Sequence, residues 1–214
     1  VANRIVREKS KTKLIVEGKS NDEYENEIFH IVNKCIEIAQ DNSIKYRDRE
    51  KAIIDYIRKE QMYLVEKFKV DEIFMTEDNK TIWDYCDTLN SLNVVTEKWP
   101  KILRQLEELE YSENDIVKFE EYLGDREKEY ENILVYFLYK HIMYGTNDGN
   151  VFQRVRFAII ATRIIFMVGL MKYIENKEFT TEDNIKVAYI FSKEIEHDDE
   201  NIDTILEDIS LGMI

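Results

Sequence analysis

The sequence has 214 residues, of which 44% are hydrophobic and 35% are charged, and its formal net charge at pH 7 is −14. A negative charge of this size argues against a broad surface for nucleic acid or for anionic lipid. Proline occurs once and glycine 6 times, so the frequent turns that a many-stranded sheet needs are missing. We therefore expect an all-α protein, in which a basic N-terminal arm (residues 1–20) precedes a single multi-helix domain (residues 21–214).

The two cysteines, Cys35 and Cys86, lie far apart and form no CxxC pair. They make neither a disulfide framework nor a metal-binding motif, so a reducing cytoplasm is the simplest location. The longest apolar run, Phe157 to Met171, contains Arg163 and is shorter than the roughly 20 residues that span a bilayer. We expect a buried helix there. Because the chain begins at Val1 without a signal-peptide pattern, an internal fragment of a longer protein is one interpretation.

The predicted elements begin with the arm, where Leu14-Ile15-Val16 is either a short strand or a segment docked on the domain. Ser112 and Thr180 each start a capping-box-like sequence, and Gly124 can close the helix that Ser112 opens. In the second helix we expect Met62 among the buried positions. Capping residues and apolar periodicity predict helices over residues 22–40, 47–67, 81–92, 97–110, 112–123, 130–143, 154–171, 180–197 and 198–209.

The segments 130–143 and 154–171 are the most apolar in the chain, and Gly145 to Gly149 separate them. A helix that is apolar nearly all round must be covered by other elements. We therefore expect a central helical hairpin. Its first helix has a tyrosine-rich face that either lines a pocket or belongs to the core with its hydroxyls at the rim. The tyrosines are Tyr130, Tyr136, Tyr139 and Tyr144.

Two Glu-x-x-His pairs, Glu27/His30 and Glu194/His197, each match half of a di-iron signature. Glu27 and His30 lie in the polar stripe of their helix, which argues against a buried metal site. Glu194 and His197 continue an apolar line, and a carboxylate in that setting needs a cation or several donors. The alternative is a helix-terminal pair that is tied to its neighbours or open to solvent.

Arg156 and Arg163 lie seven residues apart on one face of the most apolar helix. A guanidinium there either pairs with a buried carboxylate, such as Glu194 or Glu196, or binds the anionic portion of a ligand. Asn132 is either a cap or an inter-helix hydrogen-bonding group. The acidic run from Glu194 to the C-terminus is either a solvated face or a docking surface for a basic partner.

Three stretches, Glu131–Met143, Arg154–Arg163 and Phe191–Ile202, resemble in order and spacing the C-terminal half of the flagellin lysine N-methylases, the FliB-like proteins. The resemblance covers roughly residues 115–205. It implies methylation of protein lysines with S-adenosylmethionine as the methyl donor and flagellin as the substrate. That family also carries a cysteine-rich iron–sulfur region near its N-terminus, which Cys35 and Cys86 do not reproduce.

The polar residues inside these stretches are the candidates for contact with a ligand or substrate. They are Asn132, Arg154, Arg156, Arg163, Glu194, Glu196 and His197. We assign no catalytic residue and no metal ligand, and we expect a protein partner, possible self-association, no nucleic acid and no membrane. The competing hypothesis is a non-catalytic all-α module that binds a protein through the acidic C-terminal residues or the tyrosine-rich helix.

Overall fold

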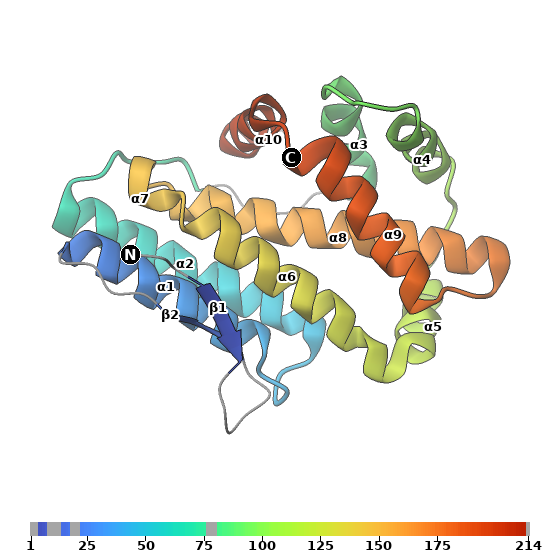
Figure 1. The fold of residues 1–214 in the computed structure, drawn as a ribbon, viewed down its shortest axis with the longest axis horizontal. Helices are drawn as coiled ribbons and strands as arrows, with labels where there is room; N and C mark the ends of the chain where they lie inside the picture. Colours follow the sequence, from blue (N-terminus) through green and yellow to red (C-terminus); the bar gives the residue numbers. More distant parts are fainter. Residues whose placement is uncertain (1–3, 8–13, 18–21, 76–80, 213–214) are drawn as a thin grey trace. The chain divides into compact units, whose positions relative to one another are not determined.

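The computed structural model describes residues 4–7, 14–17, 22–75 and 81–212. Helices make up most of this part of the chain (Figure 1), which confirms the all-α prediction. In chain order the elements are β1 (Arg4–Arg7), β2 (Leu14–Glu17), α1 (Glu23–Ala39), α2 (Tyr46–Phe68), α3 (Ile82–Ser91), α4 (Lys98–Glu107), α5 (Glu113–Leu123), η1 (Gly124–Arg126), α6 (Glu127–Ile142), α7 (Gly145–Asp148), α8 (Val151–Asn176), α9 (Thr181–Phe191), η2 (Ser192–Glu196) and α10 (Asp199–Leu211).

The chain forms two compact units, and each is assembled from two separate stretches of sequence. Unit 1 comprises Val1–Met75 and Glu131–Ile159, and unit 2 comprises Thr76–Tyr130 and Ile160–Ile214. The helices α6 and α8 therefore contribute residues to both units. The expected division into a basic arm and one domain stays a prediction, because much of the arm (residues 1–3, 8–13 and 18–20) lies outside the described residues.

In unit 1, the antiparallel pair β1 and β2 places Arg4 opposite Glu17, and β2 contacts α1. Residues 14–16 therefore form a strand that also contacts a helix, so the two alternatives for them hold together. Asp22 caps α1 by accepting hydrogen bonds from the backbone N–H groups of Tyr24 (2.7 Å) and Glu25 (3.2 Å), which satisfies donors that a helix start leaves free. Beside it runs α2 (Figure 1), as expected for two helices joined by a short turn.

The apolar positions predicted for α1 and α2 are buried or half-buried, and Met62 is the exception. Met62 was expected in the core, but it is 61% exposed. The buried line along α2 runs through Ile57, Gln61 and Leu64, and a residue one position away from Gln61 points about 100° around the helix. A polar residue, Gln61, therefore occupies the position that the apolar pattern assigned to its neighbour.

Aromatic contacts join α6 and α8 in both units and confirm the central hairpin. In unit 1 the ring of Phe157 lies 4.4 Å from that of His141 and 6.2 Å from that of Phe137, between centroids. In unit 2 the rings of Tyr130 and Phe166 are 5.2 Å apart. Since earlier residues of α6 meet later residues of α8, the two helices run antiparallel.

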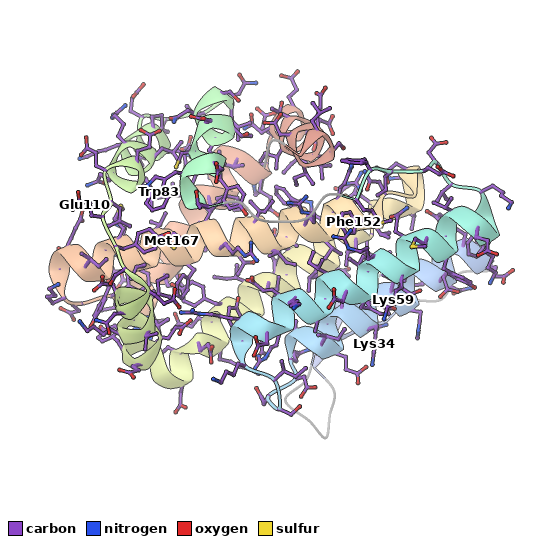
Figure 2. The ribbon with its side chains drawn as sticks, turned by 180° about the vertical axis from the view of Figure 1, so that it is seen from behind. Lys34, Lys59, Trp83, Glu110, Phe152 and Met167 are labelled. Atoms are coloured by element: carbon purple, nitrogen blue, oxygen red, sulfur yellow. The ribbon has the colours of Figure 1, made fainter. Side chains whose placement is uncertain are left out.

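The helix α8 is long and apolar enough to cross a membrane by length and composition alone. However, 72% of its most apolar window is buried inside the protein, which is the pattern of a core helix. Figure 2 labels two of its residues, Phe152 in the first turn and Met167 further along. Both are buried.

Unit 2 contains the capping motifs that the sequence predicted. Ser112 forms a capping box with Asp115 at the start of α5, and Thr180 forms one with Asp183 at the start of α9. The helix predicted to reach residue 197 is shorter than expected. It ends as α9 at Phe191, and the π-helical turn η2 follows it. Such turns insert one residue into an α-helix and occur frequently at functional sites.

Candidate functional site

Glu194, one of the candidate residues, lies in the π turn of unit 2 and is only 2% exposed. Its Oε2 atom accepts hydrogen bonds from the backbone N–H groups of Val95 (2.8 Å) and Thr96 (2.9 Å). Its Oε1 atom accepts a third from the hydroxyl of Thr96 (2.7 Å). The carboxylate thus holds the loop between α3 and α4, just before the first residue of α4, where the helix dipole also favours a negative charge.

The ionisation of Glu194 depends on these donors. Burial by itself raises the pKa of a carboxyl group, because it penalises the charged form. The hydrogen bonds from Thr96 and Val95 outweigh this effect and hold the pKa of Glu194 below its ordinary value. The side chain is therefore charged at neutral pH, and its oxygens are occupied by hydrogen bonds within the protein.

Asn201, at the start of α10, holds the same loop from a second element. Its Oδ1 atom accepts a hydrogen bond from the Asn93 backbone N–H (2.8 Å), and its Nδ2 atom donates to the Asn93 carbonyl (2.7 Å). Nδ2 also lies 3.3 Å from the backbone carbonyl oxygen of Glu194. Asn201 was not among the predicted site residues, although a signal was present, because Asn201 precedes Ile205 by four residues and so lies on the same face of α10.

The π turn separates Glu194 from His197, the pair that the sequence suggested as a unit. His197 is exposed, and its backbone N–H bonds to the Ser192 carbonyl oxygen (3.0 Å), five residues earlier. Its Nδ1 atom also lies 2.7 Å from that oxygen; since a carbonyl only accepts, Nδ1 carries the proton. Within the described part of the chain, no hydrogen bond joins His197 to Glu194.

Two other candidates also belong to unit 2. Glu196 is 3% exposed and accepts a hydrogen bond from the hydroxyl of Ser192. Arg163 is half-buried, and its Nη1 atom lies 3.5 Å from the hydroxyl oxygen of Tyr85. Because Glu194 and Glu196 are buried, the acidic run from residue 194 onward does not form one continuous exposed face.

The remaining candidates, Asn132, Arg154 and Arg156, lie in unit 1. Arg154 forms an ion pair with Asp148, and its guanidinium carbon lies 5.6 Å from the centre of the Tyr144 ring. It therefore ties the start of α8 to α7. Arg156 is 2% exposed, whereas Asn132 is exposed on α6.

The Glu27/His30 pair lies on α1, where His30 is exposed and Glu27 is half-buried. Burial and the charge of Glu27 raise the pKa of Glu60 on α2, while His30 and the hydroxyl of Tyr56 oppose the rise. Among the described residues, no group of three or more His, Cys, Asp or Glu side chains is placed to hold a metal ion.

A buried ion pair in unit 1 was not predicted. Arg49 Nη1 lies 3.0 Å from Glu131 Oε2, and the side chains are 7% and 3% exposed. Arg49 also donates to the backbone carbonyls of Ala39 (3.0 Å) and Ile44 (2.9 Å). The sequence signal was available for Glu131, because it precedes Leu134 by three residues and so lies on the same buried face.

Gln61 is a second buried polar residue that the sequence analysis missed. Its Oε1 atom accepts from the backbone N–H groups of Val151 (3.0 Å) and Phe152 (3.1 Å), and its Nε2 atom donates to the Gly149 carbonyl (2.8 Å). It caps α8 from a distant part of the chain. The backbone at Gly149 turns with φ of 71°, and a Cβ atom there would lie 2.6 Å from the Cβ of Val70.

Next to Gln61, a groove with a volume of about 680 Å³ follows the end of α2 and the non-helical segment after it. Five apolar side chains line it: Met62, Val65, Val70, Ile73 and Met75. The charged residues of its lining are Glu66, Lys69, Asp71 and Glu72. None of the seven candidate residues lines this groove.

Glu194 and the two cysteines do not fit the cofactors that the resemblance implies. Glu194 could accept the hydroxyls of a nucleoside, but it is closed to a ligand by burial and by its bonds to Val95 and Thr96. The two thiols, Cys35 and Cys86, are buried in different units. Burial raises the pKa of Cys86 to about 11 and that of Cys35 further, and this disfavours the thiolates that ligate iron.

The protein is therefore all-α, and buried hydrogen bonds between segments far apart in the sequence hold the ends of its helices in place. Comparison with known families gives a match to the FliB lysine N-methylase C-terminal domain over residues 35–211. The chain belongs to this family. No curated protein and no solved structure matches it.

Proposed function

We propose that this chain is the helical part of a protein-lysine N-methylase that uses S-adenosylmethionine and methylates flagellin. The observation that supports the proposal is the family match over residues 35–211, which covers most of the chain. The match also includes all seven candidate residues. Several of them stabilise the fold: Glu194 holds the α3–α4 loop, and Arg154 holds the start of α8.

Within this proposal, the chain contributes to recognition of the protein substrate rather than to binding of the methyl donor. The buried state of Glu194 and Glu196 supports this division of roles, since neither carboxylate is open to a small molecule. The groove in unit 1, by contrast, has an open lining of apolar and acidic side chains. The acidic side chains suit contact with lysines, and the apolar side chains suit contact with the neighbouring residues of a protein substrate.

The proposal is tested in cells that encode the protein. The gene is deleted, flagellin is purified, and mass spectrometry measures methyl groups on its lysines; growth on methionine with a deuterated methyl group reports whether the methyl groups come from S-adenosylmethionine. We expect methyl-lysine to disappear on deletion and to return when the gene is restored. Flagellin with the same lysine methylation in both strains would contradict the proposal.

A further inference from the structure

The groove of unit 1 has acidic side chains that contact no partner among the residues that the structure describes. Its lining contains three carboxylates, those of Glu66, Asp71 and Glu72. Within the described part of the chain, none of the three side chains makes an ion pair or a hydrogen bond. The single cation of the lining, Lys69, is turned back onto the helix end, where its Nζ donates to the Glu66 carbonyl oxygen at 2.7 Å. The lining itself therefore has an excess of negative charge.

The backbone beside the groove also has hydrogen-bonding groups without a backbone partner in the described chain. The segment from Asp71 to Phe74 belongs to no helix or strand, and its N–H and C=O groups make no backbone hydrogen bond within the described residues. Phe74 is 72% exposed and Met62 is 61% exposed. Unpaired backbone next to exposed apolar side chains is a surface on which an extended peptide binds through main-chain hydrogen bonds and side-chain pockets.

We propose that this groove binds a segment of the protein substrate in which lysines alternate with apolar residues. The inference rests on the proposed function, which supplies a lysine-bearing protein as the partner. Charge complementarity selects this occupant, because the lining has three carboxylates against the single cation Lys69, the described residues show no partner for those carboxylates, and the whole chain has a net charge of −14. Methionines such as Met62 and Met75 suit a varied set of apolar side chains, because they adapt their shape.

The chemistry makes this groove a docking site and not the place of methyl transfer. Carboxylates such as Asp71 and Glu72 stabilise the protonated form of a bound lysine. A lysine amine attacks a methyl donor only through its unprotonated lone pair. The groove therefore holds lysines that flank the one to be methylated.

A direct binding measurement tests the inference. The probe is a fluorescein-labelled synthetic peptide of alternating lysine and leucine, and its matched control has glutamine at each lysine position. Fluorescence anisotropy is measured with the wild-type protein and with a triple variant, Glu66→Gln, Asp71→Asn and Glu72→Gln. We expect the triple variant to bind the lysine peptide about tenfold more weakly and the wild-type affinity to fall with added salt.

The control variant removes the same charge from exposed positions of unit 2, by Glu178→Gln, Asp203→Asn and Glu207→Gln. It should bind the lysine peptide as the wild type does. Met62→Ser, at an exposed position, should weaken binding without changing the circular dichroism spectrum. Equal binding of the lysine and glutamine peptides, unchanged binding by the groove variant, or loss of binding only in the control variant would each overturn the inference.

The cellular assay separates this inference from the proposed function. If the groove variant restores flagellin methylation as fully as the wild type in a deletion strain, the groove inference fails while the proposed function stands. If wild-type cells contain no methyl-lysine in flagellin, the proposed function fails, and the anisotropy measurement still decides whether the groove binds lysine peptides. Reduced methylation with a folded groove variant supports both.

Discussion

Glu194 binds Thr96, 98 residues away in the sequence, through both the backbone N–H and the hydroxyl of the threonine. Through these contacts the buried Glu194 carboxylate fixes the loop between α3 and α4. Hydrogen bonds to a charged group are stronger than those between neutral groups. The residue is therefore expected to matter first for stability.

Glu194→Gln should destabilise the protein by about 1–3 kcal/mol, because a neutral amide replaces the charge-assisted hydrogen bonds from Val95 and Thr96 with weaker ones. Thermal or urea unfolding followed by circular dichroism measures the change. The matched control is Glu207→Gln on α10, where the glutamate is exposed and the change should stay within about 0.5 kcal/mol. Equal effects of the two substitutions would show that the contacts with Thr96 contribute nothing.

The same residue predicts a pH dependence. The pKa of Glu194 is lowered in the folded protein, so its contribution to stability is fully present above the unfolded value of about 4.3 and is lost as pH falls through the folded pKa. The difference in unfolding free energy between wild type and Glu194→Gln should be largest near neutral pH and shrink below pH ~4. A difference that grows on acidification would contradict this assignment.

The Arg49–Glu131 pair predicts strong coupling between two buried groups. Removing one partner leaves an uncompensated charge, so Arg49→Met or Glu131→Leu alone should cost about 3–5 kcal/mol. The double variant should lose clearly less than the sum of the two single losses. Urea unfolding of all four proteins gives the coupling energy, and simple additivity would show that the pair does not interact in solution.

Gly149→Ala should destabilise the protein by more than a backbone effect alone. The left-handed conformation costs a non-glycine residue roughly 1–2 kcal/mol, and the new Cβ would also lie 2.6 Å from the Cβ of Val70. Gly212→Ala is the control, since Gly212 has a similar backbone (φ 68°, ψ 24°) at the end of α10. If thermal unfolding shows the same loss in both variants, Val70 moves aside without cost.

The parts of the fold that the sequence predicted are those determined by local interactions. Asp22, Ser112 and Thr180 cap helices through bonds to residues two or three positions away, and such spacing is visible in a single sequence. The apolar segments that became α6 and α8 were equally clear, because a helix that is apolar all round has to be covered.

The parts that the sequence did not predict depend on partners far away in the chain. Gln61 caps a helix that starts 90 residues later, and Arg49 pairs with a residue 82 positions away. Local spacing can place Gln61 on the buried face of α2, next to Ile57 and Leu64, but it does not reveal the distant partner of Gln61 or of Arg49. The π turn that separates Glu194 from His197 is a further case, since one inserted residue changes which side chains share a face.

The discontinuous composition of the two units has a consequence for synthesis on the ribosome. Unit 1 needs Glu131–Ile159 in addition to its first stretch, so α1 and α2 emerge long before Glu131 can neutralise Arg49 or α8 can receive its cap from Gln61. Until then the apolar faces of α1 and α2 can pack only against each other. During translation, the exposed apolar surface of these N-terminal helices is therefore of the kind that chaperones bind.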